Sequence, residues 1–155
     1  MINPTAANHS ALQKYENTVK PFLLKADAFV EYSFIVTEAK GHAYEVGYKT
    51  DFSQVDTVLV LGGDGTLHEF VNGLLSRSQV PSHLGVQSLP VGNGNGFIKS
   101  VCFTHGQSSS LDTALWMAIR GTESKATITR LVLDTHPVYS LVSVAYATAA
   151  DIELN

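Results

Sequence analysis

The strongest constraint on the fold is one stretch near the middle of the chain, where an apolar run ends in glycines and continues as a helical pattern. Residues 57–61 are almost entirely apolar, which is typical of a strand covered on both faces of a parallel sheet. Gly62, Gly63 and Gly65 then surround Asp64. From Thr66 onward, apolar residues recur with the spacing of an amphipathic helix, at positions 67, 70, 71, 74 and 75. The stretch predicts a buried strand, a tight turn and a helix.

The turn has the features of an anion-binding site. Glycines permit positive φ and carry no Cβ, so backbone N–H groups can approach a phosphate where the helix dipole also favours negative charge. A carboxylate in such a place repels the ligand unless a cation or a proton transfer involves it. Asp64 is therefore the candidate for a chemical role.

The same residues also have a structural interpretation. Thr66 and Glu69 stand three positions apart, as in a capping box that satisfies the first N–H groups of a helix. Asp64 is a common turn residue, although three flanking glycines make a purely structural role less expected. His68 is expected on the solvated face of the helix.

A second glycine-rich cluster follows the next predicted strand. Residues 85–89 form the strand pattern, and residues 90–96 have the sequence PVGNGNG. Two turns at the carboxyl ends of parallel strands lie at the same edge of the sheet, where open α/β sheets bind ligands. The alternative is an ordinary flexible loop, because Pro, Gly and Asn are the usual turn residues.

The flanking segments predict an α/β fold with a three-layer, doubly wound parallel sheet. An apolar stripe over residues 12–26 indicates a helix that Pro21 should kink, and residues 29–36 form a strand pattern. Thr37 is expected to cap the next helix. Further helices are expected over residues 97–103 and from 111 to Gly121, the last capped by Ser110.

The spacing of apolar residues changes after residue 123. Apolar and polar residues alternate over residues 126–134 and 138–147, which predicts an antiparallel pair of strands. We therefore divide the chain into an α/β domain, residues 1–123, and the start of an incomplete β domain, residues 124–155. Two unfinished strands and an abrupt beginning at Met1 suggest a truncated chain. The exposed strand edge also predicts self-association into a homo-oligomer.

Composition excludes several classes of function. The formal charge is −4, with only 10 Lys and Arg, so nothing resembles a basic face for nucleic acid. Cys102 is the single cysteine, and the six histidines show no zinc spacing. No apolar run is long enough for a membrane-spanning helix, and no signal peptide pattern is present. A reducing compartment is expected.

Two segments together resemble a known family. Residues 62–74, GGDGTLHEFVNGL, resemble the GGDGTxxEVxNGL signature of the diacylglycerol kinase catalytic domain superfamily, and PVGNGN at 90–95 resembles its PxGxGN element. Asn3-Pro4 and Thr37-Glu38, which precede these two segments, also match the pattern of the lipid kinases in this superfamily. The similarity is greatest to the sphingosine kinase branch, because the segment 150–153, ADIE, resembles that branch's ADVD. This implies an α/β nucleotide-binding domain of the NAD kinase and diacylglycerol kinase type, followed by a β-sandwich.

The resemblance implies ATP-dependent phosphorylation of a lipid hydroxyl with Mg²⁺, namely the primary hydroxyl of a sphingoid base such as sphingosine. Asp64 would be the general base, accepting the hydroxyl proton while amides and Mg²⁺ hold the phosphoryl group. Asp151 and Glu153 would meet the amino head group of the lipid. No residue is assigned as a metal ligand. The nucleotide would be bound by Asn3, Pro4, Thr37, Gly62, Gly63, Gly65, Thr66, Glu69, Gly92, Asn93, Gly94 and Asn95.

Three departures from the family leave alternatives open. The first loop, residues 5–9, contains neither Gly nor Lys, Glu153 replaces an Asp, and the rest of the β-sandwich is missing. The alternatives are a non-catalytic nucleotide-binding remnant, a diacylglycerol or ceramide kinase, and an NAD kinase-like enzyme. A lipid substrate also implies transient membrane contact, so we expect a cytoplasmic protein that associates peripherally with intracellular membranes.

Overall fold

The sheet is parallel and is centred on the strand that precedes the first glycine turn. The computed structural model describes residues 1–155 except 27–30, 93, 122, 124, 133–136 and 142–155. Strand β1 (Thr57–Gly62) pairs in parallel with β2 (Gly85–Pro90) over their whole lengths. On the other side of β1, Ile2 bridges in parallel to both Leu61 and Val36. The predicted α/β fold with a parallel sheet is confirmed.

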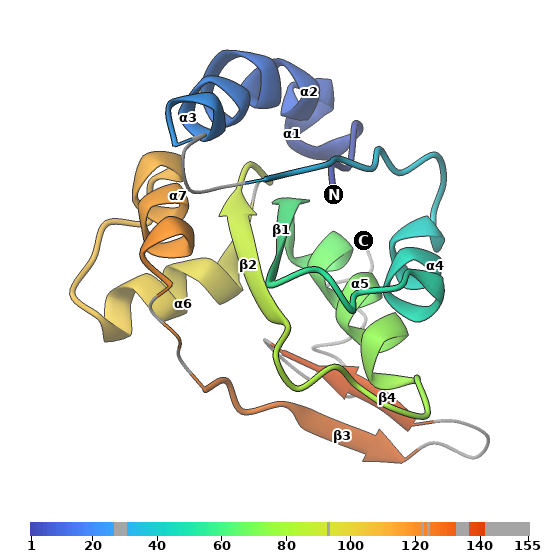
Figure 1. Cartoon of the computed structure of the whole chain (residues 1–155). Helices are drawn as coiled ribbons and strands as arrows, with labels where there is room; N and C mark the ends of the chain where they lie inside the picture. The colour runs from blue at the N-terminus through green and yellow to red at the C-terminus, as the bar shows by residue number, and fades with distance from the viewer. Residues whose placement is uncertain (27–30, 93, 122, 124, 133–136, 142–155) are drawn as a thin grey trace.

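Helices cover both faces of this sheet, because the side chains of β1 alternate between two apolar clusters. Val58 and Val60 belong to the cluster built with α4 (His42–Lys49) and α5 (Asp64–Leu75). Leu61 belongs to the cluster on the opposite face, with helices α1 (Ala6–His9), α2 (Ala11–Lys14), α3 (Lys20–Lys25), α6 (Gly96–Thr104) and α7 (Leu111–Arg120) on that side of the sheet (Figure 1).

The long helix expected over residues 12–26 forms, but with an irregular centre. A π-helical segment, η1 (Tyr15–Val19), separates α2 from α3. Pro21 stands in the first turn of α3. Because proline has no N–H to donate to the preceding turn, the regular hydrogen-bond ladder is interrupted just before it. Helix α7 is as predicted, with the Ser110 hydroxyl accepting the N–H of Thr113 and Gly121 ending the helix at φ 63°.

Two predictions around residue 36 are wrong. Within the described residues 31–36 no regular strand forms, and the single β-bridge joins Val36 to Ile2. Thr37 does not cap the next helix, because its hydroxyl donates to the carbonyl of Ile2, while its N–H donates to the same carbonyl and extends the sheet. Helix α4 begins at His42 instead, after Gly41, whose φ of 83° lies in the left-handed region.

The C-terminal strands form the predicted antiparallel hairpin. Strand β3 (Thr129–Val132) pairs with β4 (Pro137–Ser140), and both are shorter than predicted within the described residues. The hairpin lies beside α5 (Figure 1), and Ile128 and Leu141 pack against the α4–α5 cluster. The division into two domains at residue 123 stays a prediction. Across the part of the chain that the structure describes, no helix is long and apolar enough to cross a membrane.

Candidate functional site

The two glycine-rich turns touch each other at the carboxyl ends of β1 and β2. A Cβ atom on Gly92 would lie 2.5 Å from the Cα atom of Gly63, so a side chain at position 92 would separate the turns. A Cβ atom on Gly62 would lie 2.8 Å from the side chain of Thr66. None of the described glycines of the turns has a positive φ. These glycines are needed for close approach rather than for a positive φ, and the left-handed residue of the second turn is Asn95, with φ 54°.

Asp64 joins the two turns. It is the first residue of α5, and its carboxylate accepts the N–H groups of Gly96 at 2.7 Å and Phe97 at 3.1 Å. These are the first two N–H groups of α6, so the carboxylate occupies a helix N-terminus where negative charge is favoured. Asn95 closes the second turn by bonding to both the N–H and the carbonyl of Gly92.

Thr66 and Glu69 do not form a capping box. Helix α5 has Gly63 as its N-cap and no side-chain cap bond. The Thr66 hydroxyl instead accepts a bond of 2.7 Å from the Asn3 amide, and the Glu69 carboxylate accepts one of 3.0 Å from the N–H of Gly41. Both side chains of α5 therefore hold neighbouring loops, one directly after Ile2 and one before α4.

These loops and the first glycine turn enclose a cavity of about 390 Å³. Seven of the predicted nucleotide-binding residues line it: Asn3, Pro4, Thr37, Gly63, Gly65, Thr66 and Glu69. The other predicted residues are not among its lining residues. Gly62 is buried, and Asp64 faces the second turn with Gly92, Gly94 and Asn95. Asn93, Asp151 and Glu153 lie outside the described residues.

Sequence reasoning missed a cation at this cavity. Lys40 is exposed and lines the cavity together with Thr5, Glu38, Ala39 and Ala43. The first loop, residues 5–9, contains no lysine, so Lys40 is a source of positive charge that this loop does not provide. The signal was available in the sequence, because Lys40 stands two positions after the matched pair Thr37-Glu38.

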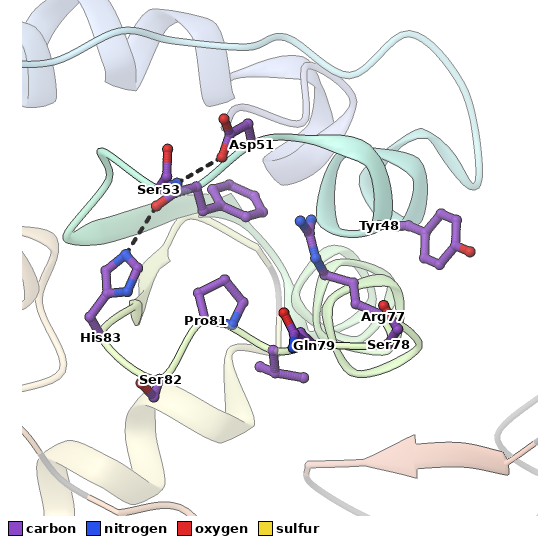
Figure 2. A pocket seen from close by; sticks show the side chains of 11 residues that line it. Tyr48, Asp51, Ser53, Arg77, Ser78, Gln79, Pro81, Ser82 and His83 are labelled. Atoms are coloured by element: carbon purple, nitrogen blue, oxygen red, sulfur yellow. Dashed lines mark hydrogen bonds between the residues drawn. The ribbon is translucent and has the colours of Figure 1, made fainter.

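A larger hollow of about 890 Å³ lies at the amino ends of the strands, and none of the predicted site residues lines it. Figure 2 shows its lining side chains, which include Arg77 and His83. Its central cation, Arg77, donates to the carbonyls of Gly47 and Thr50 and lies 5.5 Å from the centre of the Phe52 ring. His83 bonds to the carbonyl of Phe52. These side chains hold loops together at the edge of the sheet opposite the one that binds ligands in open α/β folds.

Three comparisons with known proteins agree with this architecture. Residues 1–131 match the family defined as the diacylglycerol kinase catalytic domain. The fold and its paired glycine turns thus place the chain in a class of α/β kinase-type domains. The chain belongs to the diacylglycerol kinase catalytic domain family.

Relatives and solved structures show the same likeness. The chain is 32% identical to sphingosine kinase 2 of Arabidopsis thaliana over 99% of its length, which is 32% of that protein. It is 27% identical to sphingoid long chain base kinase 5 of Saccharomyces cerevisiae. A putative diacylglycerol kinase from Bacillus anthracis superposes over 77% of this chain and 40% of that one, with a TM-score of 0.59 and 28% identity. The chain spans about a third of the length of the plant relatives.

Proposed function

We propose that this protein is the nucleotide-binding part of an ATP-dependent lipid kinase that phosphorylates the primary hydroxyl of a sphingoid base. The observation that carries this proposal is the 390 Å³ cavity, which gathers seven residues of the family signature at the ligand-binding edge of the sheet. The named sphingosine kinases among the relatives support a sphingoid base over diacylglycerol as the acceptor.

In this proposal the nucleotide occupies the cavity, with its phosphates directed to the glycine turn. Gly63 and Gly65 present backbone without side chains there, and Lys40 supplies a cation. The described residues contain no group of three potential metal-ligating side chains. A pair of carboxylates is nevertheless enough for Mg²⁺, which commonly binds one or two carboxylates and completes its coordination shell with phosphate oxygens and water. Glu38 and Glu69 line the cavity and would be those carboxylates.

Asp64 is proposed as the general base. Its two bonds to the N–H groups of Gly96 and Phe97 fix the carboxylate between the glycine turns. An ionised carboxylate has about four acceptor positions, so two remain for the acceptor hydroxyl. The proton of that hydroxyl would pass to an Asp64 oxygen as the hydroxyl oxygen bonds to the terminal phosphorus of ATP, and the bond from that phosphorus to the bridging oxygen would break with ADP as the leaving group. Asp151 and Glu153 remain proposed contacts to the lipid ammonium group.

The test is phosphate transfer from labelled ATP by the full natural protein to separate acceptors: sphingosine, diacylglycerol, ceramide and NAD. Transfer to sphingosine above the others supports the proposal, and preferential transfer to another acceptor would reassign the substrate. ATP binding without transfer to any acceptor would favour the non-catalytic remnant.

Asp64→Asn tests the role of the base. We expect turnover to fall by about 100-fold or more, as for removal of a general base, with ATP affinity within a few-fold of the parent. Asp51→Asn is the matched control, because this exposed carboxylate bonds to Ser53 at the opposite edge of the sheet, away from the glycine turns. Unchanged turnover in Asp64→Asn would refute the assignment.

Contact with a membrane, a cytoplasmic location and homo-oligomerisation belong to the same proposal. A lipid acceptor has to be reached at a bilayer, so a kinase of this kind should bind vesicles that contain sphingosine at least transiently. Co-sedimentation with such vesicles tests the membrane contact. Light scattering of the isolated chain tests self-association, and a monomer would contradict it.

A further inference from the structure

The side chain of Asn72 connects helix α5 to the C-terminal hairpin in an unusual way. Asn72 is only 8% exposed, and its Nδ2 atom donates to the carbonyl of Tyr139 while its Oδ1 atom accepts the N–H of Tyr139, both at 2.8 Å. The same Nδ2 atom donates to the carbonyl of His68 within the helix at 2.9 Å. One side-chain amide therefore satisfies both backbone groups of a residue 67 positions away in the sequence.

This arrangement imitates a neighbouring β-strand. Strand β4 has β3 as its partner on one side, and for Tyr139 the amide of Asn72 supplies the donor and the acceptor on the other. Aspartate at position 72 has nearly the same shape but, when ionised, offers no donor. Shorter side chains could not reach both groups, so the contact specifies the residue type as well as the position.

Asn72 lies on the same helix, α5, as several residues of the candidate site. Helix α5 begins at Asp64, and its Glu69 side chain holds the loop at Gly41 beside the cavity. The hairpin has further apolar contacts with the same helix layer through Ile128 and Leu141. Apolar contacts are non-directional, whereas the paired hydrogen bonds of Asn72 specify the position of β4 along α5.

We propose that Asn72 is a positioning residue that fixes the β3–β4 hairpin against helix α5 and thereby anchors, relative to Asp64, the chain that leads to the proposed lipid contacts Asp151 and Glu153. This inference rests on the proposed function for its consequence in catalysis. The attachment of the hairpin itself does not depend on that function, so the two can be tested separately.

The first experiment measures hydrogen exchange of the Tyr139 amide by NMR in the purified chain. Asn72→Ala should speed this exchange about tenfold or more, because it removes the acceptor of the Tyr139 N–H together with the donor to the Tyr139 carbonyl. Asn72→Asp is a second variant, which keeps an acceptor for the N–H but places a carboxylate against the Tyr139 carbonyl and should weaken the attachment less than Asn72→Ala does. Ser76→Ala is the control, since the Ser76 hydroxyl bonds to the Asn72 carbonyl on the same helix and does not contact the hairpin. Exchange of Tyr139 that is unchanged in both Asn72 variants overturns the attachment.

The second experiment compares nucleotide and lipid kinetics in the full natural protein. If Asn72 has a positioning role, both Asn72 variants should have an ATP dissociation constant within twofold of that of the parent protein. Their KM for sphingosine should be raised about fivefold or more. General unfolding would instead weaken ATP binding as well. Faster Tyr139 exchange with unchanged sphingosine kinetics would overturn the positioning role. A parent protein that transfers no phosphate would refute the proposed function, and the exchange of Tyr139 would still decide whether Asn72 holds the hairpin.

Discussion

Gly73→Ala should destabilise the fold strongly, because helices α4 and α5 cross in backbone contact at this residue. A Cβ atom at position 73 would lie 2.0 Å from the carbonyl oxygen of Tyr44 and 2.8 Å from its carbonyl carbon, where ordinary contact begins at 3.4 Å. Both are backbone atoms and cannot rotate away, so the helices would have to separate by about 1 Å. Overpacking of this kind costs about 3 kcal/mol at the upper end of its usual range, and the better helix propensity of alanine offsets about 1 kcal/mol. We expect a net loss of about 2 kcal/mol.

Urea denaturation followed by circular dichroism measures this loss directly. Gly65→Ala is the matched control, because Gly65 lies in the same helix and an added Cβ there would meet nothing within 4 Å. Its free energy of unfolding should change by less than about 1 kcal/mol, in the stabilising direction. If Gly73→Ala is as stable as Gly65→Ala, the helices are not in the close contact described, and the reasoning fails.

Three further predictions concern other parts of the fold. Burial lowers the pKa of the Met1 amine from 8.0 to about 6, so the unfolded chain binds this proton more readily; stability should rise by about 2 kcal/mol from pH 6 to 8, and acetylating Met1 should abolish this increment in urea titrations at each pH. Ser110→Ala removes the cap of α7 and should cost about 1 kcal/mol of unfolding free energy, a change that Ser108→Ala should not reproduce. Burial raises the pKa of the Cys102 thiol, so a thiol reagent at pH 8 should label the native protein far more slowly than the urea-unfolded chain; equal rates would contradict that burial.

The regular elements of the central unit could be predicted because local pattern and tertiary environment agree there. Strand β1 ends within one residue of its predicted limit, and α6 and α7 begin and end within one residue of theirs. In each case the regular spacing of apolar residues stops where a glycine turn or a helix cap begins. The contact of the two glycine turns followed from a general rule of parallel sheets, namely that the carboxyl ends of their strands share one edge.

Predictions that depended on a distant partner were less successful. Thr37 and Thr66 both had the sequence pattern of helix caps, yet Thr37 bonds to Ile2 and Thr66 to Asn3, more than 30 residues away. Glu69 similarly bonds to Gly41. A polar side chain that could cap a helix locally can bond equally well to a polar group that folding brings near. Lys40 was missed because its position at the cavity depends on the path of the loop before α4.

The central place of the N-terminal residues in the sheet has a consequence for synthesis. The N–H of Asn3 donates to Leu61 and the N–H of Leu61 to Met1, so these first residues bond to a strand that is translated almost 60 residues later. At about 5–20 residues per second, that interval is on the order of 3–12 s. During that interval residues 1–3 have no β1 to pair with. The sheet can be completed only after the first glycine turn has left the ribosome, and a bulky fusion joined directly to Met1 would have to be accommodated beside its central strand.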